Sequence, residues 1–384
     1  MQTRAALLAP GDPAPGFVQR NGAQPRFTFD GAAGRYLVLC FYGAGAQPHS
    51  QALLAAVEAR PDLFDDRHAA FFGVSIDPAD EATGRIANRY PGYRHFWDFD
   101  LSVSRRYGLV PETASAAAGQ VSLHRLWVVI DPTMRIIAVI PFRDDQGDIA
   151  EALDLVAALP PPDRHAGFEI MAPVLVLPRV FEPDFCRKLV DLYDATGGEE
   201  SGIMRQIGGR TVGVHDPSFK RRRDHTITDP ALISALQARI LRRVVPEIAK
   251  VHQFRVTRME RYLVACYAAD EGGHFSPHRD NTTTGTAHRR FAVSVNLNDD
   301  FEGGEVSFPE YGPRSFKAPV GGAVVFSCSL LHAVGKVTRG RRYAFLPFVY
   351  DEDAARLREQ NARLAEGEGS AEPTQRVGTG TSPR

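Results

Sequence analysis

The chain has 384 residues, of which 43% are hydrophobic and 24% are charged, as in ordinary globular proteins. Because a single hydrophobic core seldom grows beyond about 250–300 residues, we expect two domains. The formal net charge of -1 excludes an overall field that would attract nucleic acids or membranes.

Nothing in the sequence predicts a membrane or secretory protein. No apolar stretch reaches the roughly 18 residues that a membrane helix needs, and the apolar run at the start is too short for a signal peptide. The cysteines Cys40, Cys186, Cys266 and Cys328 stand apart among apolar neighbours, with no C-x-x-C pair. We therefore expect four buried thiols and a cytoplasmic protein, since thiols stay reduced there.

The first part of the chain alternates strand-like and helical stretches. Short runs rich in β-branched and aromatic residues predict strands at 35–43, 69–77 and 125–132. Helical spacing of apolar residues predicts helices at 50–64 and 148–159. Such alternation indicates an α/β sheet.

A run of three prolines, at 160–162, marks a change of texture, because proline cannot continue a helix. We expect a first domain at 1–160, a linker at 161–170, a second domain at 171–350 and a tail at 351–384. The tail begins as an amphipathic helix, and its Gly/Ser/Thr/Pro-rich end is expected to be disordered.

The second domain begins with helices and continues with strands. Helices are predicted at 182–196 and 229–251. Strands are predicted at 261–268, 290–298, 303–309, 322–329 and 342–350. This order indicates an antiparallel β core with helical support.

The segment 201–226 is long, basic and contains glycines, and we expect a loop there. Its cluster of Lys220, Arg221, Arg222 and Arg223 is consistent with a loop that meets an acidic substrate. The favoured interpretation of this cluster is a solvated basic face.

The stretch GGHFSPHRDN, at 272–281, contains candidate metal ligands. Residues i and i+2 of a strand share a face, so His278 and Asp280 present an imidazole and a carboxylate side by side. His274, four residues before His278, faces the same way. His278 is favoured because a carboxylate follows it two residues later. A distant strand end supplies His332, and two histidines with one carboxylate form a facial triad suited to Fe(II).

An arginine that could bind a second carboxylate follows His332 along the chain. Arg342 lies ten residues after His332, and its guanidinium fork suits a carboxylate held at the mouth of the same pocket. A keto acid that chelates iron with one end needs such a partner at its other end. Arg341 is the competing candidate.

The H-x-D pair, the phrase FEGGEVSF and the later histidine and arginine resemble the iron(II)/2-oxoglutarate dioxygenases of the prolyl 4-hydroxylase type, over residues 173–350. The resemblance implies a double-stranded β-helix, or jelly roll, with supporting helices. It implies iron ligation by His278, Asp280 and His332.

The same resemblance implies that Arg342 anchors the far carboxylate of 2-oxoglutarate and that Tyr267, at the end of the preceding strand, hydrogen-bonds to it. It further implies Fe(II), dioxygen and L-ascorbate. The expected reaction hydroxylates a C–H bond of an unidentified substrate, peptidyl or other, with succinate and CO2 as co-products. The alternatives are a non-catalytic iron or 2-oxoglutarate sensor or adaptor, and a thiol redox protein.

The N-terminal runs LLAPGDPAPGFV, YLVLCFYG and RLWVVIDPTMRII resemble peroxiredoxins of the alkyl-hydroperoxide-reductase type, over residues 8–159. The resemblance implies a thioredoxin-like fold. It also implies a reactive cysteine that is activated by a threonine and an arginine. Here Gly43 stands in place of a proline, Gln47 in place of the threonine and Ser50 in place of the cysteine, while Arg125 matches the arginine.

We expect this domain to be inactive as a peroxidase. The hydroxyl of Ser50 cannot be oxidised to a sulfenic acid, and Cys40 lies within an apolar strand. The expected use of the domain is docking, substrate presentation or dimerisation.

Overall fold

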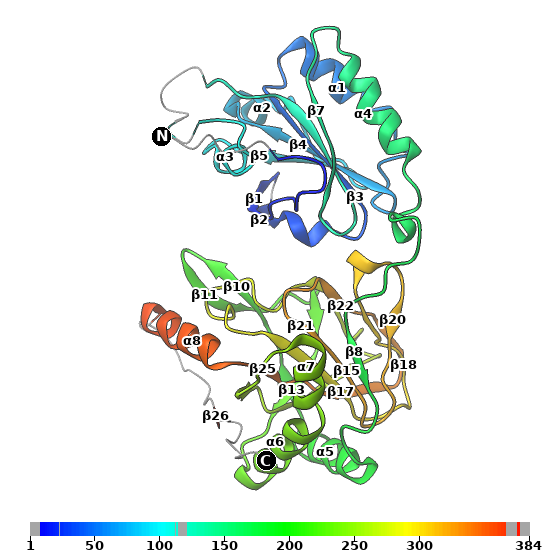
Figure 1. Cartoon of the computed structure of the whole chain (residues 1–384), viewed down its shortest axis with the longest axis vertical. Coiled ribbons are helices and arrows are strands. Elements are labelled where there is room, and N and C mark those ends of the chain that lie inside the picture. The colour runs from blue at the N-terminus through cyan, green and yellow to red at the C-terminus, as the bar shows by residue number, and fades with distance from the viewer. Residues whose placement is uncertain (1–7, 23, 112, 114–120, 366–374, 377–384) are drawn as a thin grey trace. The chain divides into compact units, whose positions relative to one another are not determined.

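The computed structural model describes residues 8–22, 24–111, 113, 121–365 and 375–376 (Figure 1). Most of the predicted disordered end of the tail lies outside these residues. Contacts divide the chain into two compact units, Met1–Ala172 with Pro309–Pro313, and Pro173–Phe308 with Arg314–Arg384. Within the described ranges, every helix is too short or too polar to cross a membrane.

The first unit contains strands and helices in alternation. Its strands are β1 (Val18–Asn21), β2 (Gln24–Thr28), β3 (Tyr36–Gly43), β4 (Ala69–Ser75), β5 (Tyr93–Trp97), β6 (Leu126–Ile130) and β7 (Ile136–Pro141). Its α-helices are α1 (Pro48–Glu58), α2 (Pro78–Ala82), α3 (Ser102–Arg106) and α4 (Gly147–Ala158), and the 3-10 helices η1 (Phe29–Ala32) and η3 (Pro162–Arg164) accompany them.

These strands form one sheet in the order β2-β1-β5-β4-β3-β6-β7. Strands β3, β4 and β5 are parallel, whereas β6 and β7 run antiparallel to their neighbours. Strand β3 is buried along its whole length, as expected for a strand covered on both faces. Its alternate residues from Tyr36 to Tyr42 pack with apolar residues of α1 and α4, which lie side by side in Figure 1. This is the predicted thioredoxin-like fold.

Helix α1 differs from its predicted range, 50–64. It begins at Pro48, where a missing N–H costs nothing, and it ends at Glu58. Pro61 explains the early end, because proline disfavours helical geometry in the residue before it. Ser50 lies in the first turn, as predicted.

The second unit is rich in strands. They are β8 (Leu175–Leu177), β9 (Glu199–Glu200), β10 (Ile203–Ile207), β11 (Arg210–Val214), β12 (Lys220–Arg221), β13 (Arg223–Thr226), β14 (Arg258–Glu260), β15 (Leu263–Ala268), β16 (His274–His278), β17 (Phe291–Asn296), β18 (Glu302–Gly303), β19 (Val306–Ser307), β20 (Ser315–Phe316), β21 (Ala323–Ser327), β22 (His332–Val334), β23 (Val337–Arg339), β24 (Arg341–Phe345), β25 (Phe348–Tyr350) and β26 (Gln375–Arg376). Its helices are α5 (Pro183–Thr196), α6 (Pro230–Arg243), α7 (Val245–His252) and α8 (Glu352–Ala365).

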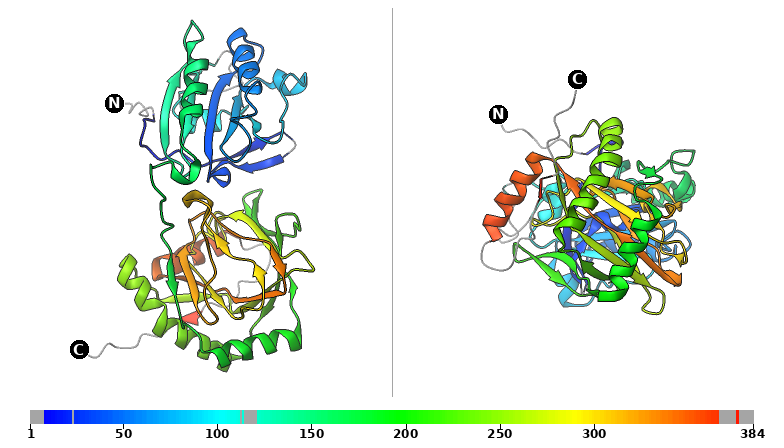
Figure 2. Two further views of the ribbon diagram at one scale, coloured as in Figure 1. Left: turned by 90° about the vertical axis from the view of Figure 1, so that its right-hand side faces the viewer. Right: turned by 90° about the horizontal axis from the view of Figure 1, so that it is seen from below.

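Two sheets build the predicted double-stranded β-helix. The larger has the order β26-β14-β25-β17-β24-β15-β13-β9, with β21 and β8 attached through β17. The smaller has the order β12-β16-β22-β19-β20. Figure 2 shows the strands of this unit curling around a common interior.

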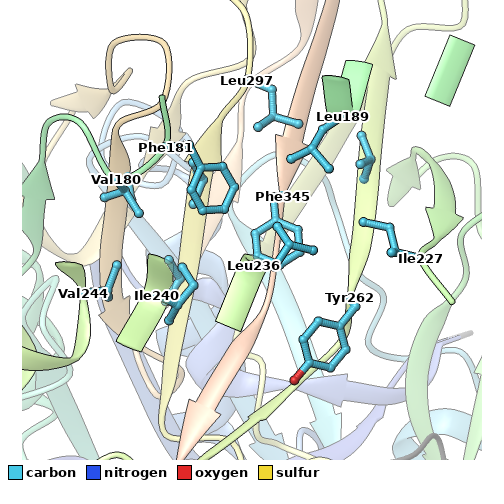
Figure 3. Close-up of a cluster of buried hydrophobic side chains, with 14 of the residues drawn as sticks. Val180, Phe181, Leu189, Ile227, Leu236, Ile240, Val244, Tyr262, Leu297 and Phe345 are labelled. Atoms are coloured by element: carbon cyan, nitrogen blue, oxygen red, sulfur yellow. The ribbon is translucent and has the colours of Figure 1, made fainter. Parts of the chain in front are cut away.

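Helices cover the outer face of the larger sheet. Leu189 of α5 and Leu236 and Ile240 of α6 are fully buried against Phe345 and other apolar residues of the sheet (Figure 3). Alternation along β15 then decides what faces inward. Val264 and its even-numbered neighbours pack under the helices, while Leu263, Ala265 and Tyr267 belong to a separate inner cluster.

Two predicted elements are each divided in two near a proline. The predicted helical stretch 229–251 forms α6 and α7, which meet at Val244, just before Pro246. The predicted strand 342–350 forms β24 and β25, with Pro347 between them, since proline cannot donate to the ladder.

The expectation of a loop at 201–226 is wrong. Strands β10 and β11 form an antiparallel hairpin. Strand β12 pairs with β16, and strand β13 pairs with β15. The basic cluster is also divided, because strand pairing turns alternate side chains to opposite faces. Lys220 and Arg222 are buried, whereas Arg221 and Arg223 are exposed, so a uniformly solvated basic face is excluded.

Candidate metal centre and co-substrate pocket

Two strands of the smaller sheet bring the predicted metal ligands together. His278 and His332 are direct partners across β16 and β22, next to a β-bulge between Phe275 and His278. Asp280 lies beyond the end of β16, and not within it as expected, and its backbone N–H donates to the carbonyl oxygen of Cys328 at 3.0 Å. One donor atom from each of the three ligand residues lies within 4.8 Å of the others.

The hydrogen bonds of the two imidazoles aim their nitrogen lone pairs at the same point. Nδ1 of His278 is 2.8 Å from the carbonyl oxygen of Ser276, and Nδ1 of His332 is 3.0 Å from that of Leu330. A carbonyl oxygen only accepts, so each Nδ1 carries the proton and each Nε2 presents a lone pair. The Nε2 atoms lie 3.6 Å and 3.4 Å from the carboxylate oxygens of Asp280. This donor set fits a divalent metal ion.

The electrostatics of the cluster also suit a cation. Burial acts to raise the pKa of Asp280, but the neighbouring imidazoles of His332 and His278 outweigh it and hold the pKa below its usual range. Burial, together with the proximity of His278, lowers the pKa of His332 to about 4. At neutral pH the site therefore contains a carboxylate and a neutral His332 imidazole, the forms that bind metal.

His274, the competing histidine, lies apart from this cluster. Its Nδ1 is 2.8 Å from the carbonyl oxygen of Gly272, and its Nε2 is 3.2 Å from that of Ser218. Both ring nitrogens are thus engaged with the backbone at the other end of β16.

Arg342 and Tyr267 face the interior between the sheets. They are cross-strand partners in β24 and β15, and their exposed fractions are 4% and 1%. The guanidinium carbon of Arg342 lies 5.4 Å from the centre of the Tyr267 ring. Arg341 points to the opposite face and is exposed. Of the two arginines, Arg342 alone lies in the interior.

Two polar residues beside Arg342 were not predicted from the sequence. Nη2 of Arg342 donates to Oγ of Ser294 at 2.9 Å, and Asn296 lies two residues further along the same strand. Nη1 of Arg342 and Oδ1 of Asn296 are buried and have no hydrogen-bond partner among the described residues, and both side chains line one small cavity. Polar residues at alternate positions of the apolar run FAVSVN were the signal in the sequence.

The buried half of the basic cluster borders this interior. Burial lowers the pKa of Lys220 to about 6, and its Nζ donates to Oγ of Ser201 and to the carbonyl oxygen of Gly202, both at 2.7 Å. Nζ of Lys220 lies 4.9 Å from the ring centre of Phe275, and that ring stacks on His278 with 3.5 Å between centres.

The first unit has Ser50 in the first turn of α1, where the peroxiredoxin resemblance expects a cysteine. Oγ of Ser50 is fully buried and donates to the carbonyl oxygen of Tyr42 at 3.3 Å. Nη1 of Arg125 donates to Oε1 of Gln47 at 2.6 Å. Burial raises the pKa of the Cys40 thiol well above its ordinary value. The four cysteines are all buried and free, as predicted.

Comparisons with known proteins agree with this division. The family described as AhpC/TSA matches residues 10–139, and the 2OG-Fe(II) oxygenase superfamily matches residues 262–350. A PKHD-type hydroxylase of Paracoccus denitrificans is 42% identical over 177 residues, which are 41% of this chain and 75% of that relative. A PKHD-type hydroxylase of Pseudomonas fluorescens is 33% identical over 117 residues, which are 28% of this chain and 50% of that relative. The chain thus spans about half the length of the first curated relatives that it matches.

Solved structures of both kinds are similar to parts of the chain. A peroxidoxin of Mycobacterium tuberculosis has 20% sequence identity and a TM-score of 0.34, covering 40% of this chain and 99% of its own. A prolyl-4-hydroxylase of Pseudomonas putida has 16% identity and a TM-score of 0.35, covering 46% of this chain and 91% of its own.

Proposed function

Because the chain belongs to the PKHD-type hydroxylases of the 2OG-Fe(II) oxygenase superfamily, we propose that its second unit is an iron(II)- and 2-oxoglutarate-dependent dioxygenase that hydroxylates a C–H bond. The co-products are succinate and CO2. One observation carries the proposal. Two imidazole lone pairs and one carboxylate converge within 4.8 Å, in the same unit as a buried arginine whose Nη1 has no partner among the described residues.

In this proposal His278, Asp280 and His332 hold Fe(II), and the chemistry that iron supplies is the activation of dioxygen at its open positions. The carbonyl groups of Ser276 and Leu330 keep the two imidazoles in the tautomer that ligates metal. Three protein ligands leave room for a chelating 2-oxo acid and dioxygen.

Arg342 has the role of anchor for the far carboxylate of 2-oxoglutarate. Its Nη1 lacks an acceptor, and a carboxylate oxygen supplies one. Oγ of Ser294 accepts from Arg342 and keeps its own hydrogen to donate to the same carboxylate. Tyr267, beside Arg342 on the inner face, is the second hydroxyl donor.

The substrate proposal is less specific than the reaction. We propose hydroxylation of a C–H bond in an unidentified substrate, peptidyl or other. L-ascorbate as reductant and a cytoplasmic location complete the proposal. The first unit then acts in docking, substrate presentation or dimerisation, because its buried Ser50 supplies no thiolate.

The test is an anaerobic reconstitution of the full chain with Fe(II) and 2-oxoglutarate, followed by exposure to oxygen with cell lysate. We expect release of succinate and products heavier by one oxygen atom. Asp280→Ala is the inactive control, and His274→Ala is the matched control, since it removes a histidine of the same strand outside the cluster. Binding of Fe(II) and 2-oxoglutarate without succinate release would instead identify a sensor or adaptor.

A further inference from the structure

Arg222 has no role in the function proposed above. It lies between β12, which belongs to the smaller sheet, and β13, which belongs to the larger one. The chain crosses from one sheet to the other at this residue. The exposed fraction of Arg222 is only 5%, whereas the adjacent Arg221 and Arg223 are exposed.

The guanidinium of Arg222 contacts the predicted co-substrate tyrosine. Its Nη1 donates to the hydroxyl oxygen of Tyr267 at 3.3 Å, and its central carbon lies 5.7 Å from the ring centre. Arg342 approaches the same ring at 5.4 Å. Tyr267 therefore lies close to two buried guanidinium groups.

This contact determines what the tyrosine hydroxyl can do. A guanidinium has donors and no acceptor, so the oxygen of Tyr267 must accept from Arg222. The hydroxyl hydrogen of Tyr267 is then available to donate elsewhere. A carboxylate bound at Arg342 is a suitable acceptor for it, because both side chains come from paired positions on one face.

Arg222 itself is held by a fixed partner. Its Nε and Nη2 donate to the two carboxylate oxygens of Asp224, at 2.7 Å and 2.6 Å. Nη2 also lies 3.2 Å from Oγ of Ser201. The bidentate pair fixes the orientation of the guanidinium and leaves Nη1 aimed at Tyr267.

We infer that Arg222 is a positioning residue of the co-substrate pocket, which makes Tyr267 a hydrogen-bond donor and selects 2-oxo acids that carry a second carboxylate. The inference rests on the proposed function. Arg222 acts through Tyr267, so its removal should weaken recognition of the far carboxylate and leave the chelating end of the acid unaffected.

The experiment measures binding, with Mn(II) in place of iron so that no turnover occurs. Calorimetric titration of the Mn(II)-loaded full chain compares 2-oxoglutarate with 2-oxopentanoate, in which a methyl group replaces the far carboxylate. The variants are Arg222→Gln and the double variant Arg222→Gln/Asp224→Asn, which avoids a half-buried carboxylate that has lost its bidentate partner. Arg223→Gln is the matched control, because it removes an exposed arginine one residue away.

We expect the wild type and Arg223→Gln to prefer 2-oxoglutarate by more than tenfold. Both Arg222 variants should lose about fivefold of that preference, the size of a typical net hydrogen bond. Tyr267→Phe should cause a similar loss, and combining it with Arg222→Gln should add nothing further. That non-additivity distinguishes positioning from an independent contribution.

Two outcomes would overturn the inference. If Arg222→Gln weakened both acids in parallel and kept the preference, Arg222 would serve only the fold at the junction of the sheets. If the wild type bound 2-oxoglutarate with Mn(II) but showed no preference over 2-oxopentanoate, the inference would fail while the metal centre stood. Failure of the wild type to bind either acid would refute the proposed function itself.

Discussion

The two units of this chain each retain a fold, but they differ in whether the side chains at its reactive position are retained. In the first unit, Ser50 lies in the first turn of α1, where the peroxiredoxin resemblance expects the cysteine, and its hydroxyl is fully buried. In the second unit, the donor atoms of His278, Asp280 and His332 lie within 4.8 Å of one another. A fold therefore does not by itself indicate an activity, and the activity of each unit must be inferred from the residues of its own site.

The environment of each site leads to the same contrast. Cys40, in the strand before α1, is fully buried, and burial raises its pKa well above the ordinary value. The metal-site residues have instead a carboxylate whose pKa is held low and an imidazole whose pKa is lowered to about 4. Burial thus suppresses the reactive form of the thiol, and it keeps His332 in its ligating form.

The largest effect should come from removing the only carboxylate of the metal cluster. Asp280→Ala should lower 2-oxoglutarate turnover at least about a hundredfold, because even an outer partner of a metal ligand is worth 10–100-fold. Succinate release by the Fe(II)-loaded chain measures it. His274→Ala should keep turnover within about twofold, and the reverse ranking of the two variants would refute the ligand assignment.

The next effect should come from the co-substrate anchor. Arg342→Gln should raise the 2-oxoglutarate concentration for half-maximal turnover by about ten- to a hundredfold, since it removes a charge-assisted hydrogen bond. Arg341→Gln should change it by less than about twofold, because Arg341 is exposed on the other face. A larger effect of Arg341→Gln would move the anchor to that residue.

Acidification should change the stabilities of the two units differently, and this effect should be smaller than those of the substitutions above. Burial acts to raise the pKa of Glu260 in the second unit, but His288 and Arg289 outweigh it and lower the pKa to about 2. Its stabilising contribution is present above the unfolded pKa and is lost as pH falls from about 4 toward 2, at most roughly 3 kcal/mol. Burial raises the pKa of Asp98 in the first unit, so its contribution is present at low pH and lost as pH rises.

Tryptophan fluorescence can distinguish the two responses. Both tryptophans of the chain, Trp97 and Trp127, lie in the first unit. Between pH 5 and pH 3, we expect the midpoint temperature of the calorimetric transition of the second unit to fall further than that of the transition detected by tryptophan fluorescence. Glu260→Gln should reduce that difference. An unchanged difference in this variant would assign the acid response to other carboxylates.

The smallest effect is expected in peroxide reduction. The metal-free full chain should reduce hydrogen peroxide no faster than a free thiol, because all four cysteines are buried. Ser50→Cys should restore weak activity at most, since Gly43 and Gln47 stand where the resemblance expects a proline and a threonine. The rate of hydrogen peroxide consumption is measured by stopped flow. Fast stoichiometric consumption that Cys40→Ser abolishes would make the first unit a working peroxidase.

The sequence alone was sufficient to identify the candidate metal ligands and both folds. The ligands were recognisable because facial triads need two histidines and a carboxylate, and because His278 and Asp280 are close along the chain. Strands β3 and β4 of the first unit were recognisable because parallel strands are covered on both faces and appear as continuous apolar runs. The pairing of His278 with Asp280 and the apolar runs are local signals, whereas His332 comes from a distant segment.

Only the tertiary structure decided which polar residues face the interior. Arg222 belongs to a run of basic residues whose members look alike in sequence, yet it is buried because the chain passes there from one sheet to the other. Ser294 and Asn296 are polar positions in an apolar strand, and their meeting with Arg342 depends on the packing of β17 against β24. Strand pairing joins residues far apart in the chain, and no local pattern contains its register.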